Sequence, residues 1–213
     1  MDKTKQRLTE MLVLQDQLNR KINQYWHKAE YPWYRAAMVE ACELHDHIGW
    51  KWWSHQEPNI SQAKLELVDI WHFGLSALLC DHNGSFTTAS SVLHNALTMP
   101  CIKQTFDLHI GNTIDTFIAE TSNQRVFPVV TFFQLCNMLD LSFNELYSLY
   151  IGKNVLNCFR QDHGYNNGTY RKRWEDGRED NDHLYDIVEL ILEDPNAENS
   201  EAEIYDHLSA RYS

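Results

Sequence analysis

The sequence has few of the residues that build disulfide frameworks, zinc sites or membrane spans. Its five cysteines, at positions 42, 80, 101, 136 and 158, lie far apart and never form a C-x-x-C pair, so neither a disulfide framework nor a zinc knuckle is expected. The longest apolar stretches, Phe73–Cys80 and Val126–Phe133, are much shorter than the ~20 residues of a membrane-spanning helix. The first residues contain no apolar h-region of a secretory signal. We therefore expect reduced thiols, a cytoplasmic location and no membrane partner.

Basic residues are also scarce. The chain has 18 Lys and Arg against 30 Asp and Glu, which gives a net charge of −12 with neutral histidines. A protein that follows a nucleic-acid backbone needs a basic surface. A nucleic-acid polymer is therefore not an expected partner, and any phosphate-bearing ligand must be met by a local basic cluster or by bound cations.

Glycine and proline interrupt the chain rarely, with eight and five residues. Between them the apolar residues recur with helical rather than strand-like periodicity, which predicts an all-α helical bundle. The length of 213 residues favours one domain over residues 1–213, with a peripheral tail over 194–213. The predicted helices cover residues 5–27, 33–49, 61–81, 87–98, 104–122, 128–138, 142–162 and 181–193.

Two of these helices carry carboxylates in the stripe that should face the core. Carboxylates 4 Å apart repel by ~4 kcal/mol at an effective dielectric of 20, so buried pairs need protons, basic partners or cations. Oxygen ligands alone favour Mg²⁺ or Mn²⁺. A solvated acidic face remains the alternative for either pair taken alone. The two inward seams are Trp33, Ala36, Glu40, Glu43, His47 and Trp50, and Ala63, Glu66, Asp69, Phe73, Ala77 and Cys80.

The carboxylates also form a recognisable motif. Glu40-Ala-Cys-Glu43 and Glu66-Leu-Val-Asp69 resemble the E-x-x-E and E-x-x-D metal-binding signature of the all-α NTP pyrophosphatases, which include MazG-like enzymes. The longer strings at residues 40–53 and 66–76 resemble the dimeric dUTPases more closely. This resemblance implies a homodimeric hydrolase that converts dUTP, with dUDP as a further substrate candidate, to dUMP. It also implies that Glu40, Glu43, Glu66 and Asp69 bind Mg²⁺, with Mn²⁺ as the alternative.

A basic region lies nearer the C-terminus. The stretch Gly152–Arg178 holds six of the eighteen basic residues. Lys153, Asn157 and Arg160 are spaced to share one helix face, which suits a polyphosphate. The glycine-bearing residues 164–180 could close over such a ligand as a mobile segment. The alternative is a solvated basic patch that balances the acidic residues beside it.

The resemblance to the dimeric dUTPases extends over this region and over the N-terminus. The strings at residues 152–161, 164–174 and 179–181 resemble the C-terminal motifs of that family, and residues 14–19 resemble its first motif. Ser54 and Asn166 depart from the family pattern, since lysine is common at both positions. The resemblance implies phosphate binding by Lys153, Asn157, Arg160, Tyr165 and Lys172, and base reading by Gln15 and Asn19. Trp50, Trp53 and Phe73 are candidates for contact with the base or sugar, and an ordinary core aromatic is the alternative for each.

The residues also favour a reaction type. No serine, cysteine or threonine lies in a recognisable nucleophile and base arrangement, whereas carboxylates with divalent ions can activate water. Glu40 or Glu43 is the expected general base, and the resemblance favours attack at the β-phosphorus. The alternatives are a pyrophosphohydrolase that prefers dCTP or a broader nucleotide set, a carboxylate di-iron protein suggested by Asp69-x-x-His72, and a non-catalytic helical interaction protein.

Overall fold

The computed structural model describes residues 2–104, 109–193 and 201–212. Within these ranges the chain is helical and forms no strand, so the predicted all-α fold is confirmed. The α-helices are α1 (Lys3–Ile22), α2 (Trp33–His47), α3 (Ile60–Asp81), α4 (Phe86–Leu97), α5 (Ile110–Gln124), α6 (Val129–Met138), α7 (Phe143–Asp162), α8 (Asp180–Glu193) and α9 (Glu201–Arg211). The 3-10 helices are η1 (Trp26–Lys28), η2 (Pro100–Ile102) and η3 (Tyr165–Asn167).

Most helix boundaries lie close to the predicted ones because proline marks several of them. Pro32 and Pro128 immediately precede α2 and α6. The first helix is the exception, because it ends at Ile22 rather than near residue 27: Asn23 adopts an extended conformation, and η1 follows as a separate turn. The predicted helix over 104–122 is found as α5 from Ile110, and residues 105–108 of that prediction lie outside the described residues.

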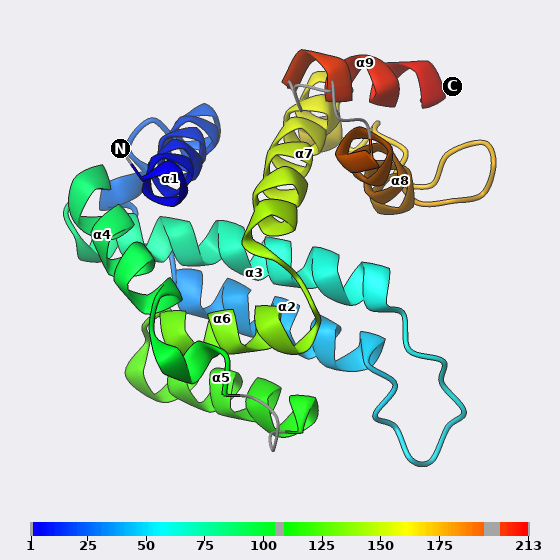
Figure 1. Ribbon diagram of the computed structural model, residues 1–213. Helices are drawn as coiled ribbons and strands as arrows, with labels where there is room; N and C mark the ends of the chain where they lie inside the picture. The colour runs from blue at the N-terminus through cyan, green and yellow to red at the C-terminus, as the bar shows by residue number, and fades with distance from the viewer. Residues whose placement is uncertain (1, 105–108, 194–200, 213) are drawn as a thin grey trace. The chain divides into compact units, whose positions relative to one another are not determined.

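The chain divides into two compact units, Met1–Ser142 and Phe143–Ser213. In the first unit, α2 runs antiparallel to α3 and also contacts α5, while α1 packs on α3 and α4 (Figure 1). In the second unit, α7, α8 and α9 contact one another. The single domain over residues 1–213 therefore stays a prediction.

Helix α3 is the centre of the first unit. It is buried on most of its circumference and contacts α1, α2, α4 and α6. Its Trp71 stacks on Phe132 of α6 with ring centroids 4.9 Å apart, and Phe127 lies within 6.1 Å of the same indole. The aromatic segment 127–133, compatible by sequence with either a core or an interface, thus belongs to the core of this unit.

The second unit has its own apolar core. Gly152 of α7 brings that helix close to α8, because a Cβ atom at this position would lie 2.8 Å from Val188 and 2.9 Å from Leu184. The predicted peripheral tail, residues 194–213, contains α9, whose Ile204 and Leu208 are fully buried. Residues 194–200 of that tail lie outside the described residues.

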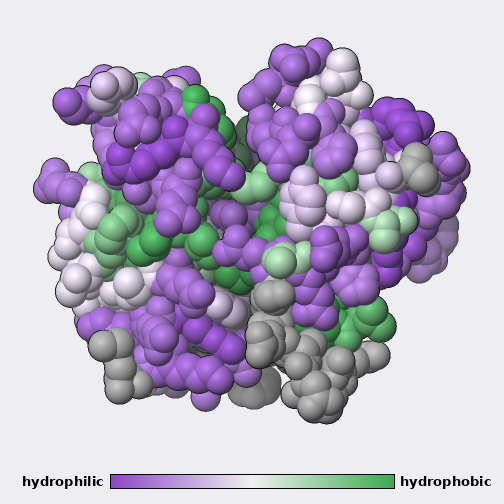
Figure 2. Space-filling model, turned by 90° about the horizontal axis from the view of Figure 1, so that it is seen from above, coloured by the Kyte–Doolittle hydropathy of each residue, from purple (hydrophilic) through white to green (hydrophobic). Residues whose placement is uncertain are grey.

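Hydrophilic residues cover most of the face shown in Figure 2, in keeping with the net charge of −12. Large apolar side chains are nonetheless exposed at the loop that joins α2 to α3, where Trp52 is 88% and Trp53 57% exposed. Among the described helices, none is long and apolar enough to cross a membrane.

Candidate active site

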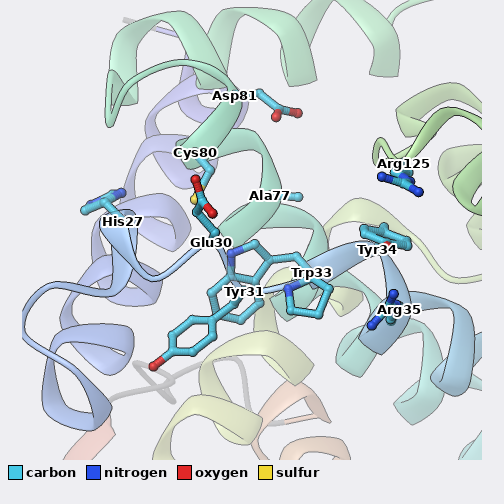
Figure 3. A pocket seen from close by; sticks show the side chains of 11 residues that line it. His27, Glu30, Tyr31, Trp33, Tyr34, Arg35, Ala77, Cys80, Asp81 and Arg125 are labelled. Carbon is cyan, nitrogen blue, oxygen red and sulfur yellow. The ribbon is translucent and has the colours of Figure 1, made fainter.

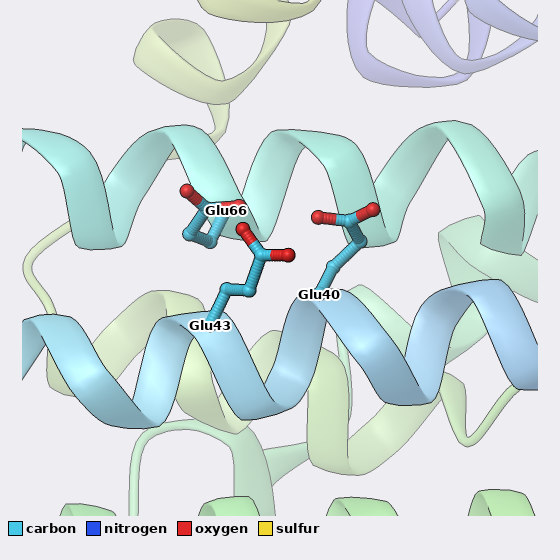
Figure 4. Close-up of side chains that lie close together, drawn as sticks. All are labelled: Glu40, Glu43 and Glu66. Carbon is cyan, nitrogen blue, oxygen red and sulfur yellow. The ribbon is translucent and has the colours of Figure 1, made fainter.

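Three of the four predicted metal ligands come together between α2 and α3. Glu40 and Glu43 project from α2 toward Glu66 on α3 (Figure 4). Each offers one carboxylate oxygen, and these oxygens all lie within 4.8 Å of one another. Asp69, one turn further along α3, is half-buried and is not part of this group. Its role as a ligand stays a prediction.

The cluster combines a buried and an exposed edge. Glu66 is only 6% exposed, whereas Glu40 is half-buried and Glu43 is exposed. The Nε2 atom of His47 lies 3.4 Å from Glu66 Oε1, so one basic group already faces the buried carboxylate. Three carboxylates at this separation repel one another strongly in a partly desolvated site. The donor set, oxygen atoms with concentrated negative charge, fits a hard divalent cation.

The prediction of which face of α2 points toward the core is wrong. The residues of α2 that are buried are Ala37, Ala41 and Leu44, not the seam through Glu40 and Glu43. The buried face is therefore rotated by about one residue from the predicted one. This leaves both glutamates at the border of the α2 and α3 contact, where small core residues bring the helices together while the carboxylates stay accessible.

A buried polar network joins α1 to α3. Gln15 Nε2 donates to Asn19 Oδ1 at 3.1 Å, and Asn19 Nδ2 donates to Ser76 Oγ at 2.9 Å. Gln15 Oε1 lies 2.7 Å from His72 Nδ1. All four side chains are at most 5% exposed. The two predicted base-reading amides thus share one network, which holds them in fixed orientations.

Sequence reasoning missed His72 and Ser76 as members of this network. The spacing Asp69-x-x-His72 suggests only the alternative of a di-iron protein and gives no sign of a contact with α1. His72 instead contacts Gln15 on α1, and the metal-capable group found in the described ranges consists of glutamates alone. A non-catalytic protein with a solvated acidic face should expose Glu66 to solvent. Because Glu66 is buried, this alternative does not fit.

The aromatic candidates lie at the edges of the first unit. Trp50 and Trp53 are 42% and 57% exposed, and their rings meet at right angles with centroids 5.2 Å apart. Trp50 Nε1 donates to Asp46 Oδ1 at 3.2 Å. Phe73 is half-buried beside Trp33, with centroids 6.3 Å apart. Their contact with a base or sugar stays a prediction.

The basic candidates on α7 belong to the second unit and are held by α8. Arg160 donates from Nε and Nη2 to the two carboxylate oxygens of Asp180 at 2.8 and 2.9 Å, and from Nη1 to Asn157 Oδ1 at 3.2 Å. Lys153 Nζ donates to Asn181 Oδ1 at 2.9 Å. Both cationic side chains are nearly buried, Lys153 at 2% and Arg160 at 9% exposure. Hydrogen bonds therefore hold the Lys153 and Arg160 side chains in fixed positions.

Asp180 is fully buried and accepts a further hydrogen bond from Tyr170 Oη at 2.9 Å. Burial acts to raise the pKa of this carboxyl, but the hydrogen bonds and the charge of Arg160 outweigh it and lower the pKa. Burial and the nearby Asp180 raise the pKa of Tyr170 well above its usual value. The result is an ionised, rigid anchor for Arg160, which the spacing of the basic residues did not indicate.

Tyr165 and Lys172 lie in the connection between α7 and α8, and both side chains are exposed. The connection is held by Trp174, which is 4% exposed and stacks on His183 with ring centroids 4.3 Å apart. The role of residues 164–180 as a mobile cover for phosphates stays a prediction.

Comparison with known proteins identifies the family of the chain. A family model described as dUTPase matches residues 7–165, a range that contains the glutamate cluster, the Gln15 network and the basic residues of α7. The search of curated proteins finds no match. Because the family model covers well over half of the chain, the chain belongs to the dimeric all-α dUTPase family, whose members are hydrolases that act on dUTP.

Proposed function

We propose that the glutamate cluster is the catalytic centre at which this protein hydrolyses dUTP to dUMP and pyrophosphate. The observation that carries the assignment is the convergence of Glu40, Glu43 and Glu66, whose oxygens lie within 4.8 Å of one another inside the region matched by the dUTPase family. A divalent metal is general in this family, and we propose Mg²⁺, with Mn²⁺ as the alternative.

The three glutamates would hold the metal, and Asp69 is the candidate fourth ligand. When bound, the metal supplies Lewis acidity that neutralises phosphate charge and lowers the pKa of water. Glu43 is exposed at the border of the two helices and Glu40 is half-buried beside it. Their carboxylate oxygens can therefore accept the proton of an attacking water. His47, whose Nε2 atom lies 3.4 Å from Glu66 Oε1, would help to orient that carboxylate.

The base-reading role falls to the buried amides. Asn19 and Gln15 each carry donors and acceptors that the network through Ser76 and His72 keeps in fixed orientations. Uracil presents alternating acceptors and a donor, and a site built from oriented amides discriminates against a base that leaves a buried amide unpaired.

We assign phosphate binding to five residues: Lys153, Asn157, Arg160, Tyr165 and Lys172. A homodimer is proposed on the family assignment alone.

A nucleotide panel tests this function. Pyrophosphate release should be fastest from dUTP when compared with dCTP, dTTP and UTP in the presence of Mg²⁺. Replacement Gln15→Ala should reduce the preference for dUTP over dCTP by about tenfold or more, because one buried amide contact contributes ~1–3 kcal/mol. Gln17→Ala is the matched control, since Gln17 is the same residue type on the same helix but is exposed.

Two results would contradict the proposal. A wild-type enzyme that hydrolyses dCTP as fast as dUTP would support the broader pyrophosphohydrolase instead. Equal selectivity in the Gln15→Ala and Gln17→Ala variants would remove the base-reading role from the network while leaving the hydrolase assignment in place.

A further inference from the structure

The first unit contains a pocket of about 580 Å³ that lies outside the proposed catalytic centre. Its walls come from η1 and the start of α2, from the end of α3, and from Arg125 at the end of α5 (Figure 3). Neither the glutamate cluster nor the Gln15 network lines it. The volume is in the range of small-molecule binding sites.

One end of this pocket is cationic. Tyr34 lies between Arg35 and Arg125 (Figure 3), and the guanidinium carbons are 5.6 and 5.9 Å from the centre of its ring. Both arginine side chains are exposed, and within the described residues neither forms a side-chain hydrogen bond or an ion pair. Two uncompensated guanidinium groups at one ring provide a site for a phosphate or another multiply charged anion.

Two carboxylates also line the pocket. Glu30 lies beside Cys80, and Asp81 lies on the last turn of α3 (Figure 3). In the part of the chain that the structure describes, neither carboxylate accepts a side-chain hydrogen bond or pairs with a cation. Asp81 is exposed as a residue, yet partial burial of its carboxyl raises its pKa. Such groups favour a ligand that brings N–H donors.

Aromatic rings form another part of the wall. Tyr31 and Trp33 meet edge to face with centroids 5.5 Å apart, and Figure 3 shows both rings within the pocket wall. His27, the remaining basic group of the wall, is already engaged by Asp16 at 3.0 Å. The groups of the pocket wall that remain available to a ligand are thus two guanidinium groups, an aromatic surface and two carboxylates.

We propose that this pocket binds a nucleotide whose base carries an exocyclic amino group. Its phosphate would contact Arg35 and Arg125, its base would pack on Trp33 or Tyr31, and its amino group would donate to Asp81 or Glu30. A base with an oxygen at the same position would present an acceptor to a carboxylate, which is unfavourable. The inference does not depend on the hydrolysis of dUTP, because the residues of the two sites are different.

Calorimetric titration with dCMP, in the absence of divalent metal, tests this proposal. The nucleotide dUMP, which has an oxygen in place of the amino group of dCMP, is the matched ligand control. It should bind at the catalytic centre alone, so Arg35→Ala and Asp81→Asn should leave its affinity unchanged. We expect dCMP to bind to wild type, and to bind about tenfold or more weakly to Arg35→Ala and to Asp81→Asn, because each substitution removes a charge-assisted contact. Hydrolysis of dUTP by Arg35→Ala without dCMP should equal that of wild type.

The variant Gln15→Ala separates the two sites, because it should weaken dUMP at the catalytic centre and leave dCMP binding unchanged. The proposal is wrong if dCMP does not bind to wild type at millimolar concentration. It is also wrong if wild type, Arg35→Ala and Asp81→Asn bind dCMP with equal affinity. Loss of dCMP binding in Gln15→Ala, or inorganic phosphate binding as tightly as dCMP, would also overturn it. Arg35 is exposed on α2, so its variant should fold, and circular dichroism checks this.

Discussion

At the scale of single residues, the buried pair of Arg160 and Asp180 shows how the fold controls a charge. Asp180 has no exposed surface, and its two carboxylate oxygens accept bonds from Arg160 and Tyr170. Removal of one partner from such a pair leaves an uncompensated buried charge, which costs about 3–5 kcal/mol. The pair therefore ties the orientation of Arg160 to the stability of the second unit.

We expect Asp180→Asn to lower the free energy of unfolding by about 3 kcal/mol at pH 7. Because the folded pKa of Asp180 is lowered, the carboxylate contributes stability above the unfolded pKa of about 3.9. That contribution is lost as the pH falls through the folded pKa. Urea unfolding of wild type and variant should therefore show a difference that shrinks below about pH 4.

The control for this variant is Asp206→Asn, since Asp206 is exposed on α9. That change should leave the free energy of unfolding near the wild-type value at every pH. A difference between wild type and Asp180→Asn that persists at the lowest pH would show that the pair does not act through the ionised carboxylate.

At the scale of elements, the close approach of α3 to the segment before α6 depends on one glycine. A Cβ atom at Gly74 would lie 2.5 Å from the ring of Phe127. This ring is 6% exposed and is held by Trp71, Phe117 and Phe132, so it has little space to move. The glycine is therefore a packing requirement in the middle of α3.

We expect Gly74→Ala to destabilise the protein by about 1–2 kcal/mol. Overpacking of a core costs about 1–3 kcal/mol, and the higher helix propensity of alanine offsets up to about 1 kcal/mol of this. Thermal and urea unfolding measure the change. The double variant Gly74→Ala with Phe127→Leu should lose less stability than the sum of the two single changes, whereas simple additivity would disprove the steric explanation.

At the scale of the whole molecule, we expect the excess negative charge and the carboxylate cluster to make stability depend on cations. A ligand that binds only the folded state raises its stability by about 2.7 kcal/mol at one hundred times its dissociation constant. The net charge of −12 adds a general effect, because any salt screens repulsion among surface carboxylates. The two effects are separable by comparing Mg²⁺ with NaCl at equal ionic strength.

We expect Mg²⁺ to raise the midpoint of thermal unfolding of the wild type above that in NaCl of equal ionic strength. Glu66→Gln should abolish the specific part of this increase, because Glu66 is the most buried member of the cluster. Glu57→Gln is the matched control and should respond as wild type does, since the Glu57 side chain is 82% exposed. Equal responses of Glu66→Gln and wild type would rule out the cluster as the magnesium site.

The sequence by itself determined most of the helices and the family of the chain. Helical periodicity, with prolines before α2 and α6, is local information, so most boundaries follow from it. The E-x-x-E and E-x-x-D spacing indicated the all-α NTP pyrophosphatases, and the longer strings around it indicated the dimeric dUTPase family, which the family model confirms. These features require no knowledge of how distant segments meet.

Only the tertiary structure decided which of these residues act together. The rotation of α2 about its axis depends on packing against α3 and α5. The sequence therefore could not show that Glu40 and Glu43 lie at the border of the core, with carboxylate oxygens within 4.8 Å of one of Glu66. The bond of Arg160 to Asp180 and the pocket at Arg35 and Arg125 likewise join residues far apart in the chain. Such contacts arise from the burial of apolar surface along whole helices, and spacing within one helix carries no information about them.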